Sequence, residues 1–257
     1  MTVRLERKEG IATITLSRPK ELNALNLETV GALVDALDAV RAGGDRVLVL
    51  AAEGKAFCAG ADRAEMILRE PREWEPIVDR YLDPVRRIAD LDIPVIARLH
   101  GDTVGGGFGL AIASDFRIAA EGIRLGAPFV RVGLAGCDMS AGYYLPRLIG
   151  LGAATELMMT GRLVRADEAL ALGLVHRVVP ADRIDEEIGD LAKRLCAGPP
   201  IALAFTKRAI RRSLDRGRDE EFDYEIFAQV QCIQTEDHRE GVKAFFDEKR
   251  PPVFRGR

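Results

Sequence analysis

Two glycine-rich stretches decide how the fold of this chain is read. The first is Gly54-Lys55-Ala56-Phe57-Cys58-Ala59-Gly60-Ala61-Asp62, and the second is His100-Gly101-Asp102-Thr103-Val104-Gly105-Gly106-Gly107. Each follows an apolar run typical of a buried strand, and each leads into a predicted helix. Small residues let the backbone approach a ligand, and free N–H groups at such turns can stabilise an oxyanion. The pair indicates a two-donor oxyanion hole, although either stretch alone is more typical of a tight strand-to-helix turn.

Outward from these stretches, strands and helices alternate up to about residue 125. Alternating apolar and charged residues predict strands at 3–8 and 11–16, joined by a turn at Glu9-Gly10. Apolar residues at helical spacing predict a helix over 27–40 with Asn26 as its N-cap. A helix containing Ala64, Glu65 and Met66 is expected after the first glycine stretch. Further strands are expected at 47–51, 95–99, 116–119 and 123–125, and further helices at 71–90 and 105–114. This order predicts an α/β core.

From about residue 131 onward, the pattern becomes almost wholly helical. Helices are predicted at 139–148, 153–160, 166–172, 184–196, 201–214 and 220–246. The segment Gly198-Pro199-Pro200 separates the predicted helices that follow it, at 201–214 and 220–246, from the rest. We therefore divide the chain into an α/β core at residues 1–197 and a helical C-terminal region at residues 198–257.

Composition excludes several classes of protein. A net charge of −3 over 257 residues gives no electrostatic attraction to nucleic acid or to an anionic membrane. The charged N-terminal segment is unlike a signal peptide, and no apolar run approaches the roughly 18 residues that span a bilayer. The four cysteines lack CxxC spacing and the three histidines lack paired spacing, so neither a disulfide framework nor a metal site is predicted. A cytoplasmic protein is expected.

Several motifs together resemble the signature blocks of the enoyl-CoA hydratase/isomerase (crotonase) superfamily. They are Arg18-Pro19-Lys20-Glu21-Leu22-Asn23-Ala24-Leu25, Ala56–Asp62, Gly105-Gly106-Gly107, Leu145-Pro146-Arg147-Leu148, Thr160-Gly161-Arg162, Ala166–Gly173 and Thr206-Lys207. The resemblance runs in order from about residue 3 to 254. It implies a crotonase-like (ClpP/crotonase) fold of repeated ββα units with a helical C-terminal region, assembled as a homotrimer or a dimer of trimers. The expected substrate is an acyl-CoA thioester, with coenzyme A as part of the substrate and no permanently bound cofactor.

The resemblance also implies roles for individual residues. The oxyanion donors are expected to be the backbone N–H groups of Ala61 and Gly106. Phe245 and Lys249 are expected to reach the coenzyme A of a neighbouring subunit, with Lys249 pairing with a phosphate. The residues expected along the coenzyme A path of the same subunit are Glu21, Leu22, Ala24, Lys55, Ala59, Asp62 and Arg63.

Two positions depart from the pattern of the hydratases in this family. Those enzymes resemble one another in two glutamates, one of which lies three residues after the middle glycine of the glycine turn. In this chain that position is Gly109, and the place of the other glutamate is taken by Phe129. General acid–base catalysis is worth roughly 10²–10⁴-fold per group, so the standard two-glutamate hydration mechanism is not expected.

One carboxylate remains at a plausible place. Counted back from Leu145-Pro146-Arg147, Asp138 corresponds to an aspartate that resembles the proton shuttle of dienoyl-CoA isomerases and the nucleophile of halobenzoyl-CoA dehalogenases. From the residues alone, Asp138 is the expected N-cap of a helix that begins near Met139. Catalysis and capping are compatible, and both stay open here.

Other residues near the two stretches have ordinary explanations. Cys58 and Cys137 are expected to pack as small side chains, because no basic neighbour in the sequence activates them. His100 is expected to brace the second glycine turn by a hydrogen bond. Tyr143 is a candidate for a position facing the acyl pocket. The charged run Lys207–Arg218 is expected to be an exposed helix surface.

The sequence therefore predicts an acyl-CoA enzyme that works through an enolate, of isomerase type or an atypical hydratase, with Asp138 as its remaining acid–base group. One alternative is an acyl-CoA hydrolase or a dehalogenase-like enzyme with Asp138 as nucleophile. A second alternative, from another class, is a non-catalytic acyl-CoA-binding homologue.

Overall fold

A six-stranded sheet forms one layer of the structure, which is a computed structural model that describes residues 1–65 and 70–257. Its strand order is β1-β2-β3-β5-β7-β10. Only β1 and β2 pair in antiparallel fashion, and they form the predicted hairpin; the other neighbours are parallel. The strands are β1 (Val3–Lys8), β2 (Ile11–Leu16), β3 (Val47–Ala52), β5 (Val95–Leu99), β7 (Phe116–Ala120) and β10 (Arg177–Val179).

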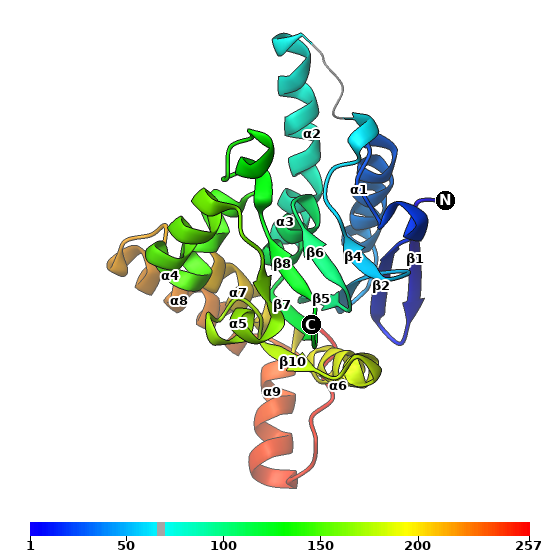
Figure 1. The fold of residues 1–257 in the computed structure, drawn as a ribbon. Coiled ribbons are helices and arrows are strands. Elements are labelled where there is room, and N and C mark those ends of the chain that lie inside the picture. Colours follow the sequence, from blue (N-terminus) through cyan, green and yellow to red (C-terminus); the bar gives the residue numbers. More distant parts are fainter. Residues whose placement is uncertain (66–69) are drawn as a thin grey trace.

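A four-stranded sheet forms a second layer, with the order β4-β6-β8-β9. Its strands are β4 (Ala56–Cys58), β6 (Asp102–Val104), β8 (Arg124–Gly126) and β9 (Val164–Arg165). Three times in succession, the chain places one strand in the large sheet, the next in the small sheet, and then enters a helix (Figure 1). These units end in α2 (Pro71–Asp90), α3 (Gly106–Ala113) and α4 (Ala141–Thr160). The repeated ββα units of the expected fold are therefore confirmed.

The core lies between these layers because each element buries its apolar face there. In α1 (Leu27–Ala42), Leu33 and Leu37 are almost completely buried, and Asn26 caps the helix by accepting from the Thr29 N–H at 2.8 Å. All eight residues of α3 are buried. The remaining helices are α5 (Ala166–Ala171), α6 (Ile184–Cys196), α7 (Pro200–Arg212), α8 (Arg218–Ile233) and α9 (Glu236–Val242), with a π-helical segment at Lys243–Glu248.

Four predicted helices differ from the structure. The two helices predicted at 139–148 and 153–160 form one element, α4, which begins only at Ala141 and is interrupted at Gly150, where φ is +78°. The single helix predicted at 220–246 is divided, because the Thr235 side chain starts α9 by accepting from the His238 N–H. After the first glycine stretch the structure has a 3₁₀ turn at Arg63–Glu65, and Met66 lies outside the described residues.

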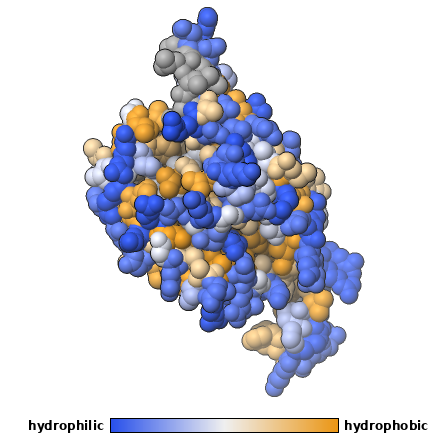
Figure 2. Space-filling view, turned by 45° about the vertical axis from the view of Figure 1, so that its right-hand side comes forward, coloured by the Kyte–Doolittle hydropathy of each residue, from blue (hydrophilic) through white to orange (hydrophobic). Residues whose placement is uncertain are grey.

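The C-terminal segment with α9 projects from one end of the molecule (Figure 1). Figure 2 shows apolar patches scattered among hydrophilic residues on the face turned to the viewer. In the described part of the chain, no helix combines the length and apolar character that crossing a bilayer requires. The division of the chain at residues 197 and 198 stays a prediction.

Candidate functional site

The pairing of two short strands brings the two glycine turns together. Strand β4 runs parallel to β6, with Ala56 opposite Asp102 and Cys58 opposite Thr103. Because both strands point the same way, the turns that follow them lie at the same edge of the small sheet. The approach is close: a Cβ atom added to Gly60 would lie 3.4 Å from the Gly106 nitrogen.

Each turn has one backbone N–H group without a hydrogen-bond partner in the part of the chain that the structure describes. The Leu25 N–H donates to the Gly60 carbonyl at 2.7 Å, and the Leu25 carbonyl accepts from the Asp62 N–H at 2.8 Å. Ala61 lies between these two bonds, so its own N–H points to the opposite side. Gly106 is the first residue of α3, where N–H groups have no partner within the helix. Among the described residues, neither amide makes a hydrogen bond, and this arrangement can stabilise an oxyanion.

Cys58 fills the space beneath the two turns. Its side chain is completely buried, and its sulfur accepts hydrogen bonds from the backbone N–H groups of Gly60 and Gly107. Burial raises the pKa of this thiol to about 12, so it stays protonated and is a poor nucleophile. A Cβ atom added to Gly107 would lie 2.4 Å from the Cys58 Cβ, which explains why a glycine is needed there. The predicted packing role of Cys58 is confirmed, whereas Cys137 is exposed.

Met139 occupies the space beside Gly109, the position at which the resemblance expects a glutamate. A Cβ atom added to Gly109 would lie 2.5 Å from the Met139 carbonyl oxygen and 2.7 Å from its Cβ. Met139 is 4% exposed, and its Cε would lie 3.6 Å from a Cβ atom on Gly106. The thioether therefore lies next to the second glycine turn. The sequence pattern does not single out Met139; the space left by the missing glutamate at 109 is the signal that points to a residue filling it.

Asp138 lies in the loop that carries Met139, and it is half-buried. Its Oδ1 accepts from the Met139 N–H at 2.7 Å. The expectation that Asp138 caps a helix starting near Met139 is wrong, because α4 begins at Ala141 and the residue before it is Ser140. The carboxylate instead stabilises the turn that leads into α4, and its second oxygen has no hydrogen bond to the described residues.

The same loop carries two signs of strain. Met139 and Ser140 have φ values of +48° and +68°, which place two consecutive non-glycine residues in the left-handed region. The Ser140 hydroxyl is buried and has no hydrogen-bond partner among the described residues. Strained backbone and unsatisfied buried polar groups concentrate at functional sites. Asp138 is therefore held by a loop whose conformation has a cost in stability.

Phe129 forms another part of the surroundings of the turns. It lies in the 3₁₀ segment Pro128–Val132, and its Cε1 would lie 3.6 Å from a Cβ atom added to Gly105. At the place where the resemblance expects a second glutamate, the site thus has an apolar ring. This surface can pack against an acyl chain and cannot transfer a proton.

Most residues expected along the coenzyme A path lie on two segments that the structure joins. The Ala59 N–H donates to the Leu22 carbonyl at 3.0 Å, close to Ala24. The Asp62 carboxylate accepts from the Ala64 N–H at 3.1 Å and from the Arg18 Nη2 at 2.9 Å. These contacts lower the pKa of Asp62, chiefly through the backbone N–H.

Some of the expected coenzyme A residues have exposed side chains on these segments, and others lie elsewhere. Glu21, Lys55 and Arg63 are exposed beside these segments. Phe245 and Lys249 lie on the projecting C-terminal segment, and Phe245 is 73% exposed.

Three expectations about neighbouring residues can be compared with the structure. The His100 Nε2 contacts the Gly54 carbonyl at 2.9 Å, which confirms its bracing role. Tyr143 does not face the acyl pocket: its hydroxyl donates to Asp215, and the Arg147 guanidinium lies 3.7 Å from its ring centre. The run Lys207–Arg218 is not simply exposed surface, because Lys207 is only 8% exposed.

Comparisons with known proteins agree with this architecture. The family model for enoyl-CoA hydratase/isomerase matches residues 6–257. A short-chain-enoyl-CoA hydratase of Clostridium acetobutylicum is 32% identical, over 98% of this chain and 97% of its own length. A 1,2-epoxyphenylacetyl-CoA isomerase of Escherichia coli is 33% identical, over 97% of both chains. The crystal structure of an enoyl-CoA hydratase from Bacillus anthracis superimposes with a TM-score of 0.95, at 33% identity and full coverage of both chains. The chain therefore belongs to the enoyl-CoA hydratase/isomerase family and is an enzyme of that family.

Proposed function

We propose that the protein moves a carbon–carbon double bond within an acyl-CoA thioester, through an enolate held by the amides of Ala61 and Gly106. The observation that carries this proposal is that the two turns are adjacent and that the N–H groups of Ala61 and Gly106 have no partner among the described residues. When a proton leaves the carbon next to the thioester, negative charge develops on the carbonyl oxygen. One such donor is typically worth about 3–4 kcal/mol of transition-state stabilisation.

Asp138 is the proposed proton carrier. Its carboxylate accepts a proton from the α- or γ-carbon of the acyl group, and the electron pair delocalises onto the thioester oxygen. The resulting carboxylic acid then returns the proton to the other carbon, while the electron pair moves back and the double bond forms in its new place. The hydrogen bond from the Met139 N–H holds one oxygen, which leaves the other for the substrate.

The residues at positions 109 and 129 disfavour hydration by the two-glutamate mechanism. Adding water requires one group to activate it and another to protonate the α-carbon. Gly109 and Phe129 can do neither, and the Met139 carbonyl leaves no room for a longer side chain at 109. The isomerase among the relatives is consistent with this proposal, while the hydratases among them support the acyl-CoA substrate class only.

The proposal can be tested with a panel of enoyl-CoA thioesters in deuterated water. We expect deuterium to enter the α- or γ-carbon of bound substrate, and hydration of crotonyl-CoA to be slow. A covalent adduct on Asp138, seen by mass spectrometry after rapid quenching, would instead support the nucleophilic alternative. Tight binding of every thioester with no exchange and no turnover would contradict the proposed reaction.

We further propose that the site is completed by a second copy of the chain. Phe245 and Lys249 on the projecting segment are the proposed contacts to a neighbour's coenzyme A. Helix α8 supports such an assembly, because apolar side chains on it are exposed: Phe222, Ile226, Phe227, Val230 and Ile233. Light scattering should give the mass of a trimer or a hexamer, and a monomer at micromolar concentration would contradict this arrangement.

A further inference from the structure

Helix α3 has an unusual requirement, because the Gly106 amide at its N-terminal end must stay available for the substrate. The helix has eight residues and contains Gly106, Gly107 and Gly109, so it has little intrinsic stability. Its N-terminal end is surrounded mainly by apolar atoms, such as the Leu25 Cδ1, 2.9 Å from a Cβ atom added to Gly106. At this end the Gly105 N–H donates to the Gly126 carbonyl at 2.9 Å and the Gly107 N–H to the Cys58 sulfur, whereas charged side chains hold the other end.

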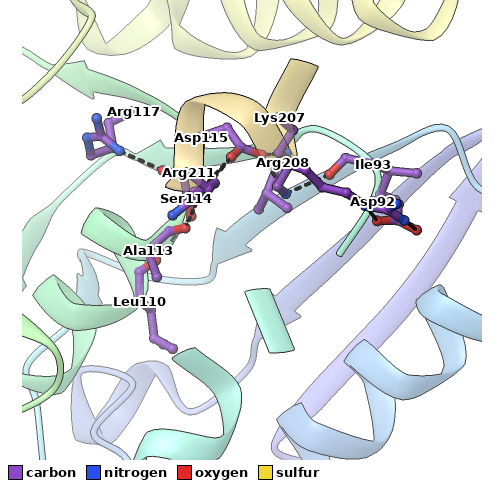
Figure 3. A network of polar contacts seen from close by, with 11 residues as sticks. Asp92, Ile93, Leu110, Ala113, Ser114, Asp115, Arg117, Lys207, Arg208 and Arg211 are labelled. Carbon is purple, nitrogen blue, oxygen red and sulfur yellow. Dashed lines mark hydrogen bonds and ion pairs between the residues drawn. The ribbon is translucent and has the colours of Figure 1, made fainter. Parts of the chain in front are cut away.

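The C-terminal end of α3 is held by three side chains (Figure 3). The Ser114 hydroxyl donates to the Leu110 carbonyl at 3.0 Å. The Arg211 Nη2 donates to the Ala113 carbonyl, and the Arg117 Nη1 donates to the Ser114 carbonyl at 2.7 Å. These are the carbonyls that a helix leaves unpaired, and cations suit the negative end of the helix dipole.

Asp115 joins this helix end to α7. Its carboxylate accepts from the Val95 N–H at 2.8 Å, from the Lys207 Nζ at 2.7 Å and from the Arg211 Nη2 at 2.7 Å. Lys207 also donates to the Ile93 carbonyl at 2.9 Å. The start of β5, the end of α3 and one face of α7 are thus connected through a single carboxylate (Figure 3).

Burying these charges is costly. Arg117 is 3% exposed and Lys207 is 8% exposed. Burial lowers the pKa of Arg117 to about 10, and it also lowers the pKa of Lys207. Buried ion pairs are often no more stabilising than apolar residues of the same volume, so their presence suggests a geometric role. In this protein, the geometric role of the buried charges is to fix the position of α3.

We propose that Arg211 and Lys207 are positioning residues, which set the Gly106 amide by holding the opposite end of α3. A hydrogen-bonded helix of eight residues is about 12 Å long and moves as one body, so a shift at Ala113 reaches Gly106. Helix α7 thereby controls an oxyanion donor that it does not touch. This inference rests on the proposed function, because it assumes that Gly106 contacts the thioester oxygen.

The test compares two arginines on α7. Arg211→Met removes the contacts with Ala113 and Asp115. Arg208→Met is the matched control, because Arg208 makes bonds of 2.8 and 2.6 Å to Asp92 from the same helix without touching α3. The readout is the infrared carbonyl stretch of butyryl-CoA, isotope-labelled at its carbonyl carbon and bound to each protein. The oxyanion hole lowers this frequency in proportion to how well the two amides are aimed.

In the parent protein we expect a clear lowering of the carbonyl frequency on binding. Arg211→Met should lose much of this lowering and about tenfold in kcat, with butyryl-CoA affinity kept within about twofold. Arg208→Met should match the parent in all three, and Arg211→Lys, which keeps a cation, should recover part of the frequency change. If Arg211→Met does not fold, Arg211→Lys compared with Arg208→Lys carries the same test.

Two results would overturn the proposal. One is a parental frequency and kcat in the folded Arg211 variant. The other is an equal loss in the Arg208 control, which would show general destabilisation of α7. A parent protein that shows no lowering on binding would contradict the oxyanion hole itself, so failure of the proposed function is distinguishable from failure of this inference.

Discussion

The two ends of the short helix α3 differ in how their backbone groups are bonded. At the N-terminal end, the Gly106 amide has no partner among the described residues, and glycines let Cys58 and Met139 pack against the backbone. At the C-terminal end, carbonyls accept hydrogen bonds from Arg117 and Arg211, and Asp115 forms an ion pair with Arg211. Under the proposed function, the difference teaches how donors are kept available for a transition state: the charged contacts lie at the end away from the proposed substrate site, and the strain lies near that site.

The largest expected effect of a single substitution is on turnover, at Asp138 near the N-terminal end of α3. Asp138→Asn keeps the shape of the side chain but cannot accept a proton at neutral pH, so turnover should fall by roughly 10²–10⁴-fold. Acyl-CoA affinity, measured by calorimetry, should change little. Asp102→Asn is the control, since that carboxylate also lies at a glycine stretch but pairs with Arg124. Full activity of Asp138→Asn would move the proton transfer to another group.

A second change tests whether Met139 truly fills the N-terminal end. Gly109→Ala places a Cβ atom 2.5 Å from the Met139 carbonyl, so unfolding in urea should show a loss of about 1–3 kcal/mol. Gly109→Glu should for the same reason fail to restore crotonyl-CoA hydration. Gly31→Ala on α1 is a control, because the nearest atom to its Cβ belongs to the flexible end of Arg80. Equal stability of the two alanine variants would show that the loop at Met139 yields easily.

A third change measures the strain at the N-terminal end directly. Ser140→Gly removes a buried hydroxyl without a partner and suits a φ of +68°. The free energy of unfolding should therefore rise by about 1 kcal/mol. Ser213→Gly, which removes a serine at the exposed end of α7, should lower stability or leave it unchanged. A less stable Ser140→Gly variant would mean that the hydroxyl has a structural partner.

The smallest expected effect is a pH dependence at the C-terminal end. The His176 Nδ1 accepts from the Arg117 N–H, and burial together with the charge of Arg117 lowers the pKa of His176 to about 4. The folded state thus binds this proton less well than the unfolded state. The contribution of neutral His176 to the free energy of unfolding is therefore fully present above the pKa of about 6.5 that the ring has in the unfolded state. This contribution is lost as the pH falls toward 4.

Because this ring is partly open to solvent, the loss should be less than about 1 kcal/mol. His176→Gln should flatten the profile of unfolding free energy between pH 6.5 and 4, whereas His238→Gln should not. A profile that His176→Gln leaves unchanged would assign the acid sensitivity to carboxylates instead.

Local patterns predicted most of the fold. The strands at Val3–Lys8 and Ile11–Leu16 have the predicted bounds, because a two-residue period and a turn at Glu9-Gly10 are both local signals. The glycine turns could be predicted for the same reason. The helix predicted over 220–246 was too long, since the apolar spacing continues across the break before Thr235.

The rest depends on contacts between distant segments. Lys207 reads as part of a solvated charged run, and only its pairing with Asp115, far away in the sequence, makes burial possible. Met139 resembles an ordinary helix residue until Gly109 is known to lie against it. Sequence spacing indicated which residues are missing from the site, but not which atoms replace them.

The contact between Gly109 and Met139 also has a consequence for how such enzymes diverge. A lineage carrying this pair cannot regain a glutamate at 109 by one substitution, because the new side chain meets a backbone carbonyl 2.5 Å from its Cβ. The loop at Met139 has to rearrange first, and that step by itself brings no new acid–base group. The order of substitutions is thus constrained by sterics, and a glutamate at 109 is difficult to introduce while the loop keeps this conformation.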